Sequence, residues 1–146
     1  MQVREIMTTD PACCTADASL EEVAKAMVEH DCGEIPIVRS SSDKSLLGVV
    51  TDRDIVCRVV AEGKNPSAYP AEHCMTSRVV TVTQDAPLNE VLTTMEKHQV
   101  RRVPVVDDRG GCVGMISQAD VAWVGKEKEV AELVREVSRD TGDISR

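Results

Sequence analysis

The chain has 146 residues, which is enough for about one domain with a substantial core. It contains no Phe, one Trp and one Tyr, so its core must be aliphatic, as in a Val- and Ile-rich sheet covered by helices. The net charge of −8 and the scarcity of aromatics argue against nucleic-acid binding. With no signal peptide and no apolar run near the roughly 20 residues that cross a bilayer, we expect a cytoplasmic protein and no membrane partner.

The first half of the chain predicts a strand, a helix, two strands and a second helix. The first helix begins at Ser19, where Glu22 completes a capping box, and its apolar residues recur at helical spacing. Gly33 follows its end. The second helix begins at Thr51 and runs to Gly63. The predicted strands are 11–15, 34–38 and 46–50.

The second half repeats the first. At an offset of 68 residues Met7-Thr8 matches Met75-Thr76, and after a two-residue deletion the offset becomes 66, where Gly48 matches Gly114. A repeat of this length is usually one supersecondary unit that cannot bury its apolar face alone. The second copy therefore predicts strands at 79–82, 102–106 and 112–116, and helices from Pro87 to His98 and from Ser117.

Two further segments complete the predicted organisation. Residues 63–70 carry two prolines and read as a linker. After Gly125, apolar residues at helical spacing predict a C-terminal amphipathic helix whose stripe is Val130, Leu133, Val134 and Val137. We expect a mixed α/β (α+β) fold of two β-α-β-β-α repeats packed with pseudo-twofold symmetry. The boundaries are repeat 1 at 1–62, linker 63–70, repeat 2 at 71–125, and C-terminal helix and tail at 126–146.

A hydroxyl residue followed three positions later by a carboxylate occurs at the same place in both copies. Thr51 and Asp54 follow the strand that contains Gly48, and Ser117 and Asp120 follow its counterpart. One interpretation is helix capping by the hydroxyl, with an acid in the first turn. The other is that the hydroxyl, the carboxylate and free helix N–H groups converge at one point, which suits a sugar diol bound by the carboxylate and a phosphate near the helix terminus. The residues alone leave both open.

A proline lies inside one predicted strand of each copy, at Pro36 and at Pro104. Proline removes a donor from the strand ladder, so it favours an edge strand. Such an edge would leave backbone groups available for the hydrogen-bonding edge of an adenine. Equally, the proline could serve only to block unwanted strand pairing.

The double repeat, the two proline-containing strands and the segments Gly48 to Asp54 and Gly114 to Asp120 strongly resemble the CBS domain family, named for cystathionine β-synthase. The resemblance covers Val3 to Val60 and Ala71 to Gly125, and a tandem pair of this kind resembles a Bateman module. The family typically senses AMP, ADP, ATP or S-adenosylmethionine in the cleft between repeats, without catalysis. The resemblance therefore implies a regulatory module that reports to a client protein, requires no cofactor, and forms a homodimer through apolar helix faces.

The resemblance also implies two ligand sites, each with a ribose-binding carboxylate. The first site comprises Thr51, Asp54, Arg78, Val79, Val80, Arg101 and Arg102. The second comprises Asp10, Pro11, Ala12, Gly33, Glu34, Ser117 and Asp120.

The two sites differ in charge. The first offers up to three arginines, whereas the second places Asp10 and Glu34 where a phosphate would need cations. We expect the Asp54 site to hold a phosphorylated nucleotide. The Asp120 site would then be weaker, empty, or suited to a neutral or cationic adenosyl compound. The alternative for Arg101 and Arg102 is that they are solvated surface charges.

No Ser-His-Asp order, metal-ligand spacing or phosphate-loop glycine cluster is present, so we expect neither an enzyme nor a metal site. The six cysteines include no CxxC pair, which favours structural thiols over a regulatory disulfide. The competing function is a ligand-free interaction or oligomerisation scaffold whose cysteines respond to redox state.

Overall fold

The computed structural model describes residues 1–124 and 127–139, so the predicted tail beyond residue 139 lies outside the described residues. The chain divides into two compact units, and each is considered by itself. The first unit is Pro11–Val79, and the second combines Met1–Asp10 with the described residues from Val80 onward. The units therefore differ from the two sequence repeats, because the first ten residues pack with the second repeat.

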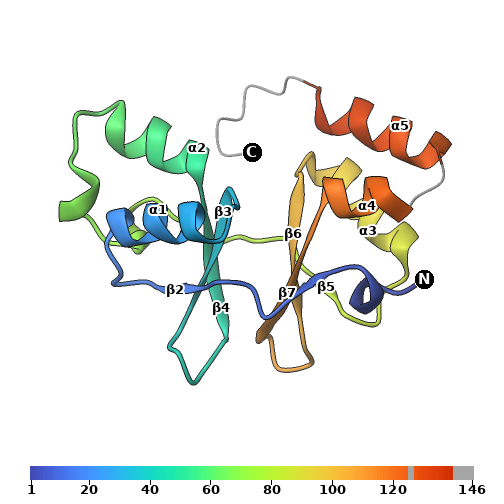
Figure 1. The fold of residues 1–146 in the computed structure, drawn as a ribbon, viewed down its shortest axis with the longest axis horizontal. Helices are drawn as coiled ribbons and strands as arrows, with labels where there is room; N and C mark the ends of the chain where they lie inside the picture. Colours follow the sequence, from blue (N-terminus) through green and yellow to red (C-terminus); the bar gives the residue numbers. More distant parts are fainter. Residues whose placement is uncertain (125–126, 140–146) are drawn as a thin grey trace. The chain divides into compact units, whose positions relative to one another are not determined.

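The first unit contains a three-stranded sheet in the order β2-β3-β4 (Figure 1). Strand β2 is parallel to β3, and β3 is antiparallel to β4. The elements are β2 (Cys14–Thr15), α1 (Leu20–Glu29), β3 (Glu34–Val38), β4 (Leu46–Thr51), α2 (Asp52–Ile55), the π-helical turn η2 (Val56–Val60), and the 3-10 turns η3 (Pro66–Ala68) and η4 (Ala71–His73).

The second unit contains a four-stranded sheet in the order β1-β7-β6-β5. Strand β5 is parallel to β6, and β7 is antiparallel to both β6 and β1. The elements are the 3-10 turn η1 (Val3–Glu5), β1 (Thr8–Thr9), β5 (Val82–Thr83), α3 (Leu88–His98), β6 (Arg102–Val106), β7 (Cys112–Ser117), α4 (Gln118–Val124) and α5 (Glu127–Val137).

The predicted element order is confirmed in both repeats, with three corrections. The strand predicted at 11–15 shortens to Cys14–Thr15, and the strand predicted at 79–82 begins and ends later, at Val82–Thr83, because only these pairs of residues reach the neighbouring strand. The helix predicted from Thr51 to Gly63 changes to a π-helical turn at Val56 and ends before Gly63, whose φ of 73° suits glycine. Strand β1 was not predicted from the sequence.

Each repeat begins with a leading segment, Met1–Asp10 in the first repeat and residues 71–79 in the second. Each leading segment belongs to the compact unit that the other repeat mainly forms, and equivalent hydrogen bonds hold the two segments there. The N–H of Val3 donates to the carbonyl of Ala86 over 2.9 Å, and the N–H of Ala71 donates to the carbonyl of Ala18 over 2.7 Å. These pairs are related by the offset of 68. Further along each segment, Thr8 pairs with β7 of the second unit, and Thr76 pairs with β4 of the first.

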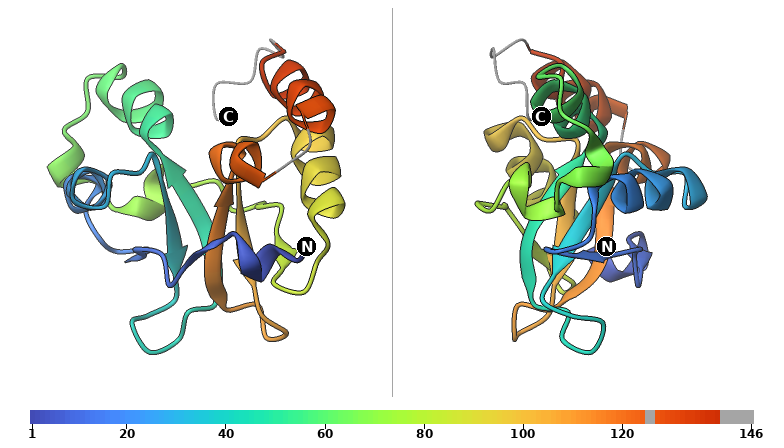
Figure 2. Two further views of the ribbon diagram at one scale, coloured as in Figure 1. Left: turned by 45° about the vertical axis from the view of Figure 1, so that its right-hand side comes forward. Right: turned by 90° about the vertical axis from the view of Figure 1, so that its left-hand side faces the viewer.

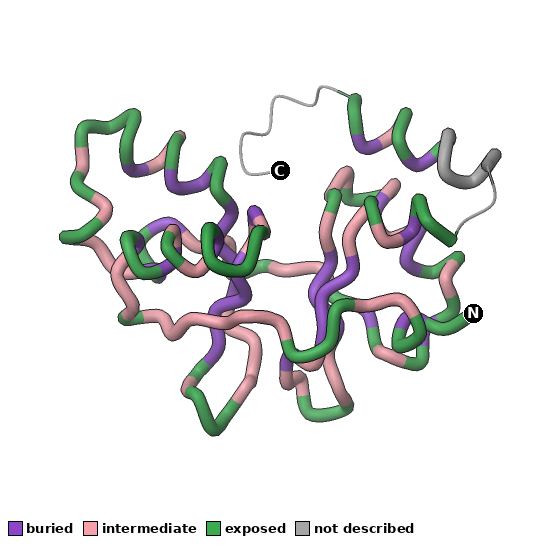
Figure 3. Tube along the Cα trace, viewed as in Figure 1, coloured by how far each residue is buried: buried purple, intermediate pink, exposed green. Residues whose placement is uncertain are grey.

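Each unit has its own aliphatic core, and Figure 3 shows buried residues along the central strands and on the inner sides of the helices. In the second unit, α5 packs against α3 and α4 (Figure 2). It contributes the fully buried Leu133 and the buried Val137 to that core, whereas Val134 is 42% exposed. Leu133 and Val137 thus pack inward as members of the predicted stripe, and Val134 does not. The side chain of Val130, the fourth predicted member, lies outside the described residues.

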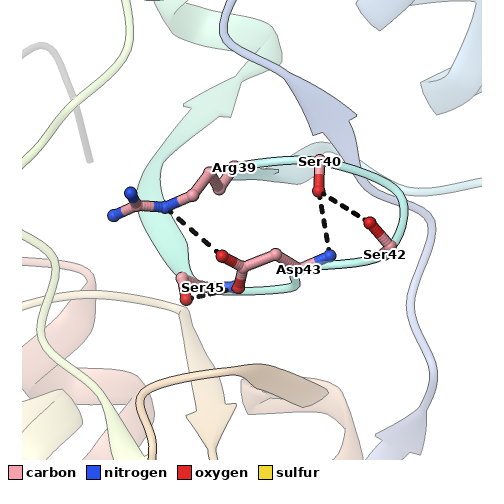
Figure 4. Close-up of polar contacts among 5 residues, drawn as sticks. All are labelled: Arg39, Ser40, Ser42, Asp43 and Ser45. Carbon is pink, nitrogen blue, oxygen red and sulfur yellow. Dashed lines mark hydrogen bonds and ion pairs between the residues drawn. The ribbon is translucent and has the colours of Figure 1, made fainter.

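The loop between β3 and β4 is a small polar network (Figure 4). The side chain of Asp43 accepts hydrogen bonds from the hydroxyl and the N–H of Ser45 and pairs with Arg39, and together these hold the pKa of Asp43 below its ordinary value. In the second unit, Asp107 instead accepts the N–H groups of Arg109 and Gly111, which closes a tighter turn. This shorter turn accommodates the two-residue deletion between repeats.

Candidate functional site

Thr51 and Asp54 form a corner where β4 runs into α2. The Asp54 N–H donates to Thr51 Oγ1 over 3.0 Å, and the Thr51 N–H donates to Asp54 Oδ2 over 2.9 Å. This is a reciprocal capping box, so the capping interpretation of this motif is confirmed. Both residues are buried, with Thr51 6% and Asp54 1% exposed. A buried carboxylate fixed in one orientation is also a preformed acceptor for hydroxyl groups.

The N–H groups at the start of α2 already have acceptors. Asp52 donates to the carbonyl of Gly33 over 2.9 Å, Arg53 donates to the Asp52 side chain over 2.8 Å, and Asp54 donates to Thr51. These N–H groups are therefore not free, so this part of the ligand-binding interpretation is wrong, whereas a phosphate near the corner stays a prediction. The capping that shapes the corner uses the donors that the phosphate would need.

Arg58 is a charged neighbour of this corner that the sequence analysis missed. Its Nε lies 3.8 Å from Asp54 Oδ1, and its Nη1 donates to the carbonyl of Cys74 over 3.4 Å. The spacing of four residues from Asp54 to Arg58 was a usable signal, since an acid and a base four apart share one helix face. By contrast, Asp52 and Arg53 are exposed.

Cys74 lies beside the same corner. Burial, reinforced by the negative charge of Asp54 and opposed by Arg58, raises the pKa of its thiol to about 11. Burial also raises the pKa of Cys14, with Cys13 and Glu22 adding to the effect. At neutral pH both thiols are in the protonated form, which is the less nucleophilic one.

We therefore expect Cys74 to be slow to react with a thiol reagent in the folded protein. Labelling with iodoacetamide at pH 8, followed by peptide mass spectrometry, should leave Cys74 unmodified after the partly exposed Cys32 and Cys57 have reacted. In urea, all three should react at similar rates. Rapid native labelling of Cys74 would contradict this placement and would favour the redox-responsive alternative.

Ser117 and Asp120 form the equivalent corner of the second unit. The Ser117 N–H donates to Asp120 Oδ2 over 2.8 Å, the Ser117 hydroxyl donates to the same oxygen over 2.9 Å, and the Asp120 N–H donates to Ser117 Oγ over 3.2 Å. Both residues are half-buried, so this corner is more accessible than that of Asp54. The counterpart of Arg58 is Val124, so the acid–arginine pair is not repeated.

Within each unit, the corner lies beside the start of its own proline-containing strand. Glu34 is opposite Thr51 in the ladder, and Arg102 is opposite Ser117. The carbonyls of Gly33 and Arg101 accept the N–H groups of the first helical residues, Asp52 and Gln118. Acidic Glu34 thus shares a unit with Asp54, and the two arginines share a unit with Asp120.

The remaining predicted site residues are distributed between the two units. Arg78 is exposed and Val79 half-buried in the first unit, whereas Val80 is half-buried in the second. Pro11 and Ala12 are half-buried and precede β2. Completion of the Asp54 site by Arg78, Val79, Val80, Arg101 and Arg102 stays a prediction. The same holds for completion of the Asp120 site by residues 10–12, 33 and 34.

The prolines do not lie on edge strands, contrary to the prediction. Pro36 is in β3, between β2 and β4, and Pro104 is in β6, between β5 and β7. The missing donor is tolerated because the parallel partner is short. Strand β2 reaches only Ile37 and Val38, and β5 reaches only Val105 and Val106, so both prolines lie just before the paired segment.

Residues 1–124 and 127–139 contain no group of three or more His, Cys, Asp or Glu side chains placed to hold a metal ion. Within the same residues, every helix is too short or too polar to traverse a bilayer.

Comparison with known proteins agrees with this repeat architecture. The family model described as CBS domain matches residues 3–61 and 71–126. Hypoxic response protein 1 of Mycobacterium tuberculosis is 35% identical over 92% of this chain and 92% of its own. Among solved structures, the CBS domain pair of protein MJ0100 in complex with 5′-methylthioadenosine and S-adenosyl-L-methionine is 30% identical, covers 85% of this chain and 94% of that chain, and has a TM-score of 0.75. The CBS domain protein PAE2072 from Pyrobaculum aerophilum, complexed with AMP, is 26% identical, covers 92% of this chain and 99% of that chain, and has a TM-score of 0.78.

Proposed function

Because this chain belongs to the CBS domain family and carries two copies of the domain, we propose that it is a non-catalytic regulatory module that binds an adenosine-containing ligand. An adenine nucleotide such as AMP, ADP or ATP is the proposed ligand class. In this proposal, the carboxylates of Asp54 and Asp120 accept hydrogen bonds from ribose hydroxyls.

The observation that carries the proposal is the repeated corner. In both units a backbone N–H of the hydroxyl residue orients the carboxylate, at 2.9 Å for Asp54 and 2.8 Å for Asp120. Preorganised acceptors bind a diol without losing side-chain freedom on binding. The ligands of the MJ0100 and PAE2072 structures support the same class, since 5′-methylthioadenosine, S-adenosylmethionine and AMP share an adenosine group.

The ligand would act as a signal if it binds one conformational state of the module more tightly than another. A ligand shifts an equilibrium only by the difference between its affinities for the two states. We propose that ligand binding changes a surface that a client protein or a second copy of the chain contacts. This proposal includes the formation of a homodimer and the binding of a client protein.

Ligand binding can be tested through stability. AMP at 100 times its Kd should raise the free energy of unfolding by about 2.7 kcal/mol. Asp54→Asn should remove most of this stabilisation and Asp120→Asn less, because we assign the phosphorylated ligand to the Asp54 corner. The measurement is thermal unfolding with AMP, ADP, ATP, adenosine and S-adenosylmethionine.

The matched control is Asp52→Asn, which changes an exposed carboxylate on the same helix and should leave the AMP response unchanged. If Asp54→Asn and Asp120→Asn both keep the wild-type response to every compound, the ribose is not bound at these corners. Oxidation-dependent shifts with no response to adenosine compounds would favour the redox-responsive scaffold instead.

A further inference from the structure

Any phosphorylated ligand at the Asp54 corner needs positive charge, and the helix start does not supply free donors. The N–H groups of Asp52, Arg53 and Asp54 are all engaged within the first unit. The protein as a whole is acidic, with a net charge of −8. A cationic side chain therefore has to provide the phosphate contact, either one of the predicted Arg78, Arg101 and Arg102 or one that lies beside the carboxylate within the first unit.

Arg58 has the position and the freedom to do so. Its guanidinium lies next to the carboxylate proposed to bind the ribose, and its side chain is 37% exposed. Both described contacts are long, at 3.8 Å to Asp54 and 3.4 Å to the Cys74 carbonyl, compared with about 2.7–2.9 Å for charge-assisted hydrogen bonds. A phosphate could offer shorter, bidentate contacts to the same planar group.

The arginine also distinguishes the two corners. It lies on the π-helical turn η2, four residues after Asp54, and its counterpart four residues after Asp120 is Val124. Only the first unit therefore combines the sugar-binding carboxylate with an arginine on the same helical segment.

We propose that Arg58 is the specificity-determining residue of the Asp54 corner, which selects phosphorylated over unphosphorylated adenosine ligands. In the free protein its guanidinium pairs with Asp54. When a nucleotide binds, the ribose hydroxyls take the Asp54 carboxylate and the guanidinium turns to the phosphate. This inference rests on the proposed function, since it presumes that Asp54 binds a ribose.

The test is calorimetric titration of AMP and adenosine into the wild type and into Arg58→Gln. Arg58→Gln should weaken AMP binding at least tenfold and change adenosine binding by less than threefold. Arg58→Lys should lose less AMP affinity than Arg58→Gln, because an ammonium keeps the charge but not the bidentate geometry. The control Arg53→Gln, on the same helix and exposed, should behave as the wild type.

The outcomes separate this inference from the function on which it rests. If both Arg58 variants lose as much affinity for adenosine as for AMP, Arg58 only maintains the corner. If the AMP affinity is unchanged, the phosphate is bound elsewhere. Either result overturns the inference and leaves the proposed function standing. If the wild type binds neither compound, the proposed function fails and the inference fails with it. If Arg58→Gln does not fold, the test uses the ratio of AMP affinity to adenosine affinity in Arg58→Lys. A ratio equal to that of the wild type overturns the inference.

Discussion

Replacing Gly48 by alanine is expected to lower the free energy of unfolding by about 3 kcal/mol, the upper part of the usual range for overpacking. A Cβ on Gly48 would lie 2.6 Å from the backbone carbonyl oxygen of Thr76 and 3.0 Å from Met75 Sδ. The Thr76 backbone is held against β4 by two hydrogen bonds with Val49, at 2.9 and 3.0 Å. The added methyl group must therefore push a paired segment away from the sheet. Urea unfolding followed by circular dichroism measures the loss.

Gly114→Ala is the matched comparison in the second unit. There the Cβ would meet Met7 Sδ at 2.5 Å and the Thr8 carbonyl oxygen at 3.1 Å. The closest atom belongs to a flexible side chain, so we expect a smaller loss of about 1 kcal/mol. Wild-type stability of Gly48→Ala, or a larger loss for Gly114→Ala, would show that the leading segments yield more readily than their hydrogen bonding indicates.

Leu133→Ala is expected to cost about 3 kcal/mol in the unfolding of the second unit, because removing a fully buried leucine leaves a cavity. Leu133 has no exposed surface and contacts the aliphatic core from α5. Because α5 packs mainly against α3, part of the loss should appear as weaker docking of this helix. Urea unfolding and amide hydrogen exchange on α3 together measure both effects.

The control for this variant is Val134→Ala on the same helix. Val134 is 42% exposed, so its truncation should change the free energy of unfolding by less than about 0.5 kcal/mol. Equal effects of the two substitutions would mean that Leu133 is not buried against the second unit. A large effect of Val134→Ala would instead indicate that this side chain is covered, for example by a second copy of the chain.

Most of the local structure could be predicted from residue patterns. The helix at Leu20–Glu29 follows from the capping residue Ser19 and the apolar spacing, and its cap is present in the structure, where Ser19 Oγ accepts the N–H of Glu22. The strands with Pro36 and Pro104 were also predicted with their bounds. Their central position in the sheet was not predicted, because it depends on pairing with the short strands β2 and β5, which come from other segments of the chain.

The candidate corners were predicted in part. Thr51 with Asp54, and Ser117 with Asp120, are neighbours over three residues, so their pairing was visible in the sequence. The expectation of free helix N–H groups was wrong, because Gly33, distant in sequence, accepts the first of them and the side chains of Asp52 and Thr51 accept the next two. Burial of Asp54 and its proximity to Cys74 likewise depend on the segment that packs over β4.

By itself, the sequence determined the duplication, the order of strands and helices in each copy, and the two hydroxyl–carboxylate corners. These features depend on hydrophobic period and on capping, which act between residues a few positions apart. Only the tertiary structure decided that each leading segment packs on the opposite repeat, and that Arg58 bridges Asp54 and a carbonyl 16 residues further along the chain. Such contacts form when helices and strands that are distant in sequence pack together to bury their apolar faces. Local residue patterns do not predict which of these elements will pack together.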